Sequence, residues 1–195
     1  MASAFRPAIL RAVAGWLALL VVGTASSAAP KTGQRWNDMD YGPFLTASIE
    51  APSPKTNLAY KGIAINLGRA FGGTHNEAIV FDTDLLRYSA GWTGSFVALK
   101  GVVFDGEHWA YPAINGEQLF GNPMQPGWDQ AGRFQDPREH PFGPLPKNWA
   151  HWKGLHLHGQ KVVLNYTVGD MAVRDLPALE RSPQIGTFAR TVNVG

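Results

Sequence analysis

The sequence contains no cysteine. A chain without cysteine has no disulfide framework, no thiol nucleophile, no thiolate zinc site and no Cys-x-x-Cys-His haem attachment. Nucleophile elbows, phosphate-binding glycine loops and dinucleotide fingerprints are absent as well, because Gly72-Gly73 is not followed by the required pattern. We therefore expect no cofactor, and the sequence favours a protein that is not an enzyme.

The chain also lacks an excess of basic charge once its first segment is set aside. It has 17 Lys and Arg and 15 Asp and Glu, and residues 1–28 hold two of the basic residues, Arg6 and Arg11, and no acidic one. Residues 29–195 therefore carry 15 basic and 15 acidic side chains, without a clustered basic run. Nucleic acid and anionic membrane surfaces are not expected partners.

Residues 1–28 have the order of a secretory signal peptide. Arg6 and Arg11 precede an apolar run from Ala12 to Val22, and small residues follow up to Ala28. The run of about 11 residues is shorter than the roughly 20 of a membrane-spanning helix, so an uncleaved anchor is the less favoured alternative. We expect export to the periplasm or the cell exterior, cleavage after Ala28, no stable membrane span, and one domain over residues 29–195.

The remaining chain has little helical periodicity and many turn residues, with 22 Gly and 14 Pro in the full sequence. Such a composition predicts an all-β protein with short strands. Lys-Gly phrases recur at Lys61, Lys100 and Lys153 and begin similar apolar stretches. Three units are too few for a β-propeller, so we expect an antiparallel β-sandwich built from quasi-repeated hairpins.

Two hairpins are predicted by their turns. In residues 151–169, Gly159-Gln160 suits a two-residue type II′ turn. In residues 77–92, Asp82 is placed to accept hydrogen bonds from the backbone of its own turn. A last strand is expected at 187–194, whereas the proline-containing residues 170–186 are expected to be irregular.

The composition of residues 106–150 predicts a long, irregular, aromatic-rich excursion, which we expect to cover one end of the sheets or to line a cleft. Exposed indole rings stack on sugar rings, so candidate ligand-binding residues are Trp109, Trp128, Trp149, Trp152 and the adjacent His151. The alternative is that these tryptophans fill the core, as they often do in β domains.

His156 and His158 are candidate metal ligands, because residues two apart on a strand share a face. A third ligand would be His108, His140 or a carboxylate. The alternative is that these histidines belong to the polar face of a half-exposed strand.

Several motifs occur in an order that resembles an uncharacterised bacterial domain family. The motifs are Trp36-Asn37-Asp38-Met39-Asp40-Tyr41-Gly42-Pro43, Tyr60-Lys61-Gly62-Ile63, Phe81-Asp82-Thr83-Asp84-Leu85-Leu86-Arg87, Gly91-Trp92-Thr93-Gly94, Trp152-Lys153-Gly154-Leu155 and Leu157-His158-Gly159. That domain of unknown function occurs near the N-terminus of large exported proteins that also contain sugar-dehydrogenase-like propellers and c-type cytochrome domains. The resemblance implies an accessory role and assigns no catalytic residue.

Three functional hypotheses follow. The leading one is an exported binding module that contacts a carbohydrate or an exported redox protein through its aromatic excursion. The second is a metal-assisted hydrolase or lyase that uses the clustered histidines. The third is a structural fragment of a larger multidomain protein.

Overall fold

The computed structural model describes residues 40–52, 56–69, 75–99, 111–133, 135–181 and 186–195, all within one compact unit spanning Thr32–Gly195. Every regular element in these residues is a β-strand, so the all-β prediction is confirmed. The nine strands are β1 Phe44–Glu50, β2 Asn57–Arg69, β3 Asn76–Asp82, β4 Arg87–Ala98, β5 Ala113–Gly121, β6 Ala150–His158, β7 Lys161–Val168, β8 Met171–Arg181 and β9 Gly186–Val194. In this part of the chain, no helix is long and apolar enough to cross a membrane.

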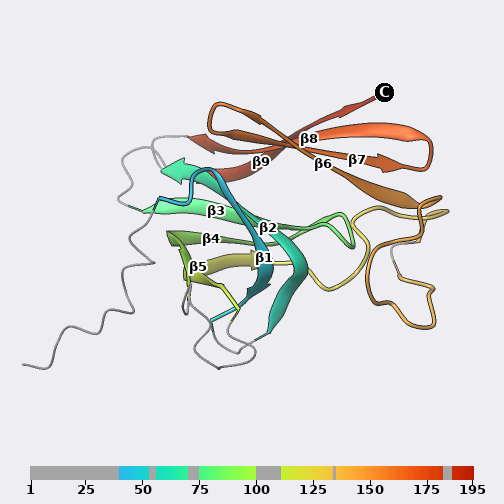
Figure 1. The fold of residues 1–195 in the computed structure, drawn as a ribbon, viewed down its shortest axis with the longest axis horizontal. Helices are drawn as coiled ribbons and strands as arrows, with labels where there is room; N and C mark the ends of the chain where they lie inside the picture. The colour runs from blue at the N-terminus through green and yellow to red at the C-terminus, as the bar shows by residue number, and fades with distance from the viewer. Residues whose placement is uncertain (1–39, 53–55, 70–74, 100–110, 134, 182–185) are drawn as a thin grey trace, which may run out of the picture. The chain divides into compact units, whose positions relative to one another are not determined.

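The strands form two sheets that pack against each other (Figure 1). We call β1–β5 the barrel sheet and β6–β9 the open sheet; in both, neighbours in sequence pair antiparallel. The predicted antiparallel sandwich is therefore confirmed, with the addition that one sheet curls until its first and last strands meet. A single parallel pair, Glu50 with Ala113, joins them, and the Glu50 N–H donates to the Pro112 carbonyl at 2.9 Å.

Bulges and close backbone contacts explain why the barrel sheet can curl. Register shifts interrupt every antiparallel pairing in it, and each extra residue bends and twists its strand. Gly94 and Gly116 face each other on β4 and β5, and a Cβ on Gly116 would lie 2.0 Å from the Thr93 carbonyl oxygen. Only glycine allows the two strands to approach this closely.

The middle parts of β2, β3 and β4 are buried on both faces of the barrel sheet, and side-chain size differs between the faces. Small residues such as Ala64 and Ala78 point into the barrel around the fully buried Trp92, whose Nε1–H donates to the carbonyl oxygens of Ser95 and Phe96 at 2.9 Å. The alternate residues on the same strands are larger and pack toward the open sheet: Ile63, Ile65, Ile79 and Phe81. This arrangement explains the nearly continuous apolar sequence of β3.

The core between the sheets is rich in aromatic side chains. Phe81 stacks on Tyr166 with ring centroids 5.8 Å apart and meets Tyr88 edge-on at 5.1 Å. Val162, Leu164 and Val173 complete this inter-sheet core from the open sheet. Burial of these groups holds the two sheets together.

The predicted hairpins are confirmed. β6 and β7 are joined by Gly159-Gln160, and Gly159 has a φ of 61°, as the first position of a type II′ turn requires. β3 and β4 are joined by residues 83–86, and an Asp82 carboxylate oxygen accepts from the Asp84 and Leu85 N–H groups at 3.0 and 3.4 Å. Of the Lys-Gly phrases, the first lies within β2 and the third within β6, whereas the second falls outside the described residues.

Two strands lie where the sequence predicted irregular chain. Residues 113–121 form β5, so the excursion is shorter than expected; this strand has no regular apolar–polar alternation and is held by backbone pairing with β4. Residues 171–181 form β8 in spite of Pro177. β7 pairs with β8 only up to Asp175, so one side of β8 is open at Pro177, where a missing N–H is tolerated.

Candidate functional site

Three of the predicted tryptophans come together in the inter-sheet core, and the fourth, Trp109, lies outside the described residues. Trp149 is buried, with 4% of its surface exposed, and Trp128 and Trp152 are partly buried against the same cluster. The alternative expectation, that these tryptophans fill the core, therefore fits Trp149 best. Trp152 is only partly buried and lines a surface groove.

The groove has a volume of about 460 Å³ and lies where the edge of the open sheet meets β1 and β2. Its lining residues are Thr46, Ala47, Ser48, Tyr60, Lys61, Gly62, Ile63, Thr83, Trp152, Gly154 and Leu155. Trp152 is backed by Phe81, with ring centroids 5.8 Å apart, so the core fixes the position of the indole. Gly154, next to a bulge in β6, has open space where a Cβ would lie, which keeps this wall of the groove low.

Polar side chains in the groove are already oriented by the backbone. The Ser48 hydroxyl donates to the Tyr60 carbonyl at 2.7 Å, and the Thr83 hydroxyl donates to the Lys61 carbonyl at 2.8 Å. Each hydroxyl oxygen retains lone pairs that can accept a hydrogen bond from a ligand. Lys61 Nζ lies 3.2 Å from an Asp84 carboxylate oxygen and remains largely exposed. The groove therefore offers an aromatic face beside both acceptors and donors.

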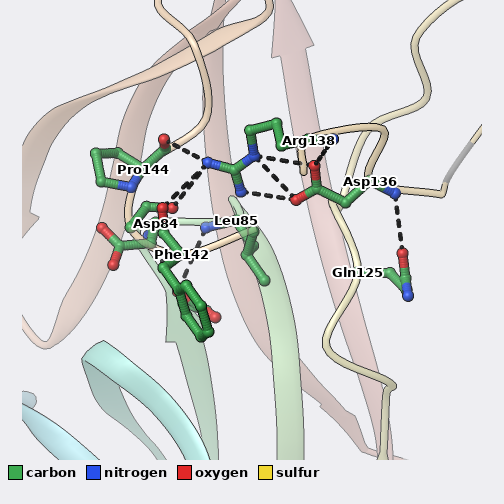
Figure 2. A network of polar contacts seen from close by, with 9 residues as sticks. Asp84, Leu85, Gln125, Asp136, Arg138, Phe142 and Pro144 are labelled. Atoms are coloured by element: carbon green, nitrogen blue, oxygen red, sulfur yellow. Dashed lines mark hydrogen bonds and ion pairs between the residues drawn. The ribbon is translucent and has the colours of Figure 1, made fainter. Parts of the chain in front are cut away.

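The loop between β5 and β6 is held by Arg138 (Figure 2). Its guanidinium binds both carboxylate oxygens of Asp136, at 2.7 Å for the closest pair, and Nη1 donates to the carbonyl oxygens of Phe142, Gly143 and Pro144. The hydrogen bond from Arg138 lowers the pKa of Asp136 below the usual carboxyl value. The Leu145 N–H donates to the Asp84 carbonyl at 3.0 Å, which ties this loop to the β3–β4 turn.

A buried polar cluster lies behind the groove, in the inter-sheet core. Asp175 is fully buried and accepts hydrogen bonds from the hydroxyls of Tyr88 at 3.0 Å and Tyr166 at 2.8 Å. Arg190 donates to both Asp175 oxygens and lies over the rings of Tyr88 and Trp128. Burial and then the Asp175 charge raise the pKa of both tyrosines far above the ordinary value, so the hydroxyls stay protonated as donors.

Arg190 also borders a second cavity, of about 390 Å³, together with Arg87 and the loop at Asn122–Gly127. Burial would lower the pKa of the Arg190 guanidinium, but the charge and hydrogen bonds of Asp175 raise it above the usual value. Arg87 pairs with Asp82 at 3.4 Å. Both arginines that line this cavity therefore already pair with a carboxylate.

The predicted metal ligands lie on one strand, and both are exposed. His156 and His158 belong to β6 and pair across the ladder with Val163 and Lys161. Within the described residues, no group of three or more His, Cys, Asp or Glu side chains could hold a metal ion. His151 is half-buried, and partial desolvation followed by the charges of Lys153 and Lys147 lowers its pKa. The metal site stays a prediction.

Sequence reasoning missed Tyr60, Lys61 and the Asp175–Arg190 pair. Tyr60-Lys61 opens the first repeated phrase, but nothing in that phrase indicates that the tyrosine lies at the surface beside Trp152. Arg190 and Asp175 are 15 residues apart, and Tyr88 is 87 residues from Asp175. Only the pairing of β8 with β9 and the docking of the sheets bring them together.

Comparison with known families adds one finding. Residues 79–175 match the model of a family described as a domain of unknown function, DUF6797. A DUF6797 domain is found in this chain. The DUF6797 match runs from β3 into β8 and contains Trp152, Tyr166 and Asp175, whereas Tyr60 and Arg190 lie outside it. No curated protein and no solved structure matches the chain significantly.

Proposed function

We propose that this protein is an exported accessory module that binds carbohydrate in the groove between Trp152 and Tyr60. The observation that carries the proposal is a partly exposed indole, fixed by the core, in one groove with a half-exposed tyrosine and oriented hydroxyls. The flat face of an aromatic ring complements the C–H groups on one face of a sugar ring. The surrounding donors and acceptors complement the sugar hydroxyls.

The size of the groove agrees with this ligand class, since sites for small molecules commonly have volumes of about 300–1,000 Å³. A slightly larger hollow of about 490 Å³ lies among β2, β7 and β8, but its lining has no aromatic ring and a single charged side chain, Lys161. That hollow offers little to orient a sugar. The groove is the better candidate because its apolar and polar groups converge.

Binding without hydrolysis is the activity that the lining supports. None of the described residues that line the groove is Asp, Glu or His. Cleavage of a glycosidic bond ordinarily needs two carboxyl groups on opposite sides of the bond. Since the groove has aromatic, hydroxyl and ammonium groups, it suits retention of a sugar chain.

Export and an accessory role are supported by the sequence. Residues 1–28 have the charge and apolar order of a signal peptide. The motif order resembles a domain that accompanies sugar-dehydrogenase-like propellers and cytochromes in large exported proteins. A module that holds a carbohydrate near such enzymes would raise the local concentration of their substrate.

The proposal is tested by calorimetric titration of the purified protein with cello-, xylo- and manno-oligosaccharides. We expect at least one series to bind and Trp152→Ala to abolish that binding. Tyr60→Ala, which removes a side chain that is 53% exposed, should weaken binding without affecting the fold. Leu157→Ala, on the same strand as Trp152 and outside the groove, is the matched control and should bind normally. Absence of binding across the three series would refute the proposal.

A further inference from the structure

Tyr60 borders two hollows on the surface. One is the groove with Trp152, and the other is a small hollow of about 20 Å³ lined by Tyr60, Asp82, Asp84, Leu85, Met124, Pro141, Phe142 and Gly143. Tyr60, Met124 and Phe142 are all exposed large hydrophobic residues. They line one hollow together with Asp82 and Asp84, and Tyr60 connects this hollow to the groove.

Phe142 is exposed although its backbone is fixed. Phe142 is 75% exposed, whereas the carbonyl oxygens of residues 142–144 all accept from Arg138 (Figure 2). The Leu145 N–H continues the attachment by donating to the Asp84 carbonyl. An aromatic ring presented to water on an ordered loop loses little further freedom when a ligand covers it. This is the arrangement of a binding platform.

The ion pair between Lys61 and Asp84 joins the two hollows. Lys61 lines the groove and Asp84 lines the small hollow, with Nζ and the carboxylate oxygen 3.2 Å apart. A neighbouring ammonium and carboxylate supply donors and acceptors side by side, which matches the adjacent hydroxyls of a sugar. Polar recognition is therefore present between the aromatic faces of Trp152 and Phe142.

We propose that the carbohydrate site extends across Tyr60 to Phe142 and takes an extended oligosaccharide chain, with one part of the chain in the groove and a further sugar unit on the Phe142 ring. This inference rests on the proposed function and specifies its ligand class. Stacking requires a flat, exposed ring face and no large enclosed volume, so the small volume of the second hollow is compatible with it. A site confined to the groove would take a terminal sugar or a disaccharide equally well.

The test compares affinity with ligand length. Wild-type protein is titrated with the series that binds, from disaccharide to hexasaccharide, beside Phe142→Ala and Arg138→Gln. We expect wild-type affinity to rise with length, and Phe142→Ala to bind the longest chain roughly three- to tenfold more weakly while binding the disaccharide normally. Arg138→Gln releases the loop that carries Phe142 but keeps the Phe142 ring. It should likewise reduce the increase in affinity with oligosaccharide length. Leu119→Ala, an exposed side chain on β5 outside both hollows, is the control.

The outcomes separate this inference from the proposed function. If the disaccharide binds, but affinity does not rise with length or Phe142→Ala binds every length as wild type does, the extended site is refuted and the groove stands. If none of the oligosaccharides binds, the proposed function itself is refuted. A length effect that is lost in Phe142→Ala and kept in Leu119→Ala supports the extended site.

Discussion

Substitution of Asp175 by Asn should destabilise the protein, because this carboxylate organises the polar cluster between the sheets. It is fully buried and accepts from Tyr88, Tyr166 and Arg190, which belong to β4, β7 and β9. Asn has nearly the same volume, so the change removes the charge without creating a cavity. It also places an amide N–H₂ where one carboxylate oxygen accepted hydrogen bonds.

The expected magnitude follows from these contacts. A hydrogen bond to a charged group contributes about 1.5–3 kcal/mol to stability, and a hydrogen bond between neutral groups about 0.5–1.5 kcal/mol. Loss of the charge should therefore weaken each of the three bonds from Tyr88, Tyr166 and Arg190 by roughly 1 kcal/mol. The Arg190 side chain is 41% exposed, so hydrogen bonds to water compensate for part of the interaction that Arg190 loses. We expect the free energy of unfolding to fall by about 2–3 kcal/mol. For a chain of this size, that lowers Tm by roughly 5–10 °C.

Thermal and urea unfolding, followed by circular dichroism and tryptophan fluorescence, measure this change. Asp170→Asn is the matched control, because Asp170 is exposed in the turn between β7 and β8. A double-mutant cycle with Arg190→Gln should show a coupling of about 1–3 kcal/mol. If Asp175→Asn lies within about 0.5 kcal/mol of the control, the typical effect of a surface change, the cluster does not stabilise the sheet interface.

Three further predictions follow. Gly127→Ala should cost about 1–3 kcal/mol of unfolding free energy in a urea melt, because its Cβ would lie 2.0 Å from the Leu86 carbonyl oxygen and force the loop off β4; an unchanged midpoint would contradict this close contact. The pKa of Asp136 is lowered in the folded state, so its stabilisation is present above the ordinary carboxyl pKa and is lost as pH falls through the folded value. Asp136→Asn should therefore make the free energy of unfolding depend less on pH below the ordinary carboxyl pKa, and an unchanged dependence at acid pH would refute the assignment. His108, a candidate third ligand, lies outside the described residues, so the metal site predicts stoichiometric zinc that is lost in His156→Ala or His158→Ala; less than about a tenth of an equivalent in the wild type would refute it.

The parts of the fold that the sequence predicts are those determined by neighbouring residues. Gly159 marks its hairpin through the backbone conformation it permits, and Asp82 marks the other through hydrogen bonds within its own turn. β5 and β8 carry no such signal. β5 has no regular apolar–polar alternation, and β8 contains Pro177, which is tolerated because β7 pairs with β8 only up to Asp175. Their strand conformation depends on partners that no local pattern indicates.

The candidate site was predictable only in part for the same reason. The prediction that an exposed tryptophan binds a ligand includes Trp152, but the pattern around Trp149, which is buried, looks equally suitable. What distinguishes them is the docking of the two sheets, which covers Trp149 and leaves Trp152 at the boundary. Tyr60 becomes part of a site only through that docking, because it lies on β2, whereas Trp152 lies on β6.

The position of the groove links the proposed carbohydrate binding to the sheet interface. Its walls come from β1, β2 and β6, so it exists only while the barrel sheet and the open sheet are docked. The Asp175 cluster joins strands of both sheets but does not line the groove. Asp175→Asn should therefore bind oligosaccharide with wild-type affinity well below its melting temperature, and should lose binding at a temperature lowered by the same amount as Tm. Calorimetric titration at several temperatures measures this. A weaker affinity at low temperature would instead mean that the cluster shapes the groove directly, and loss of binding far below Tm would mean that the sheets separate before the protein unfolds.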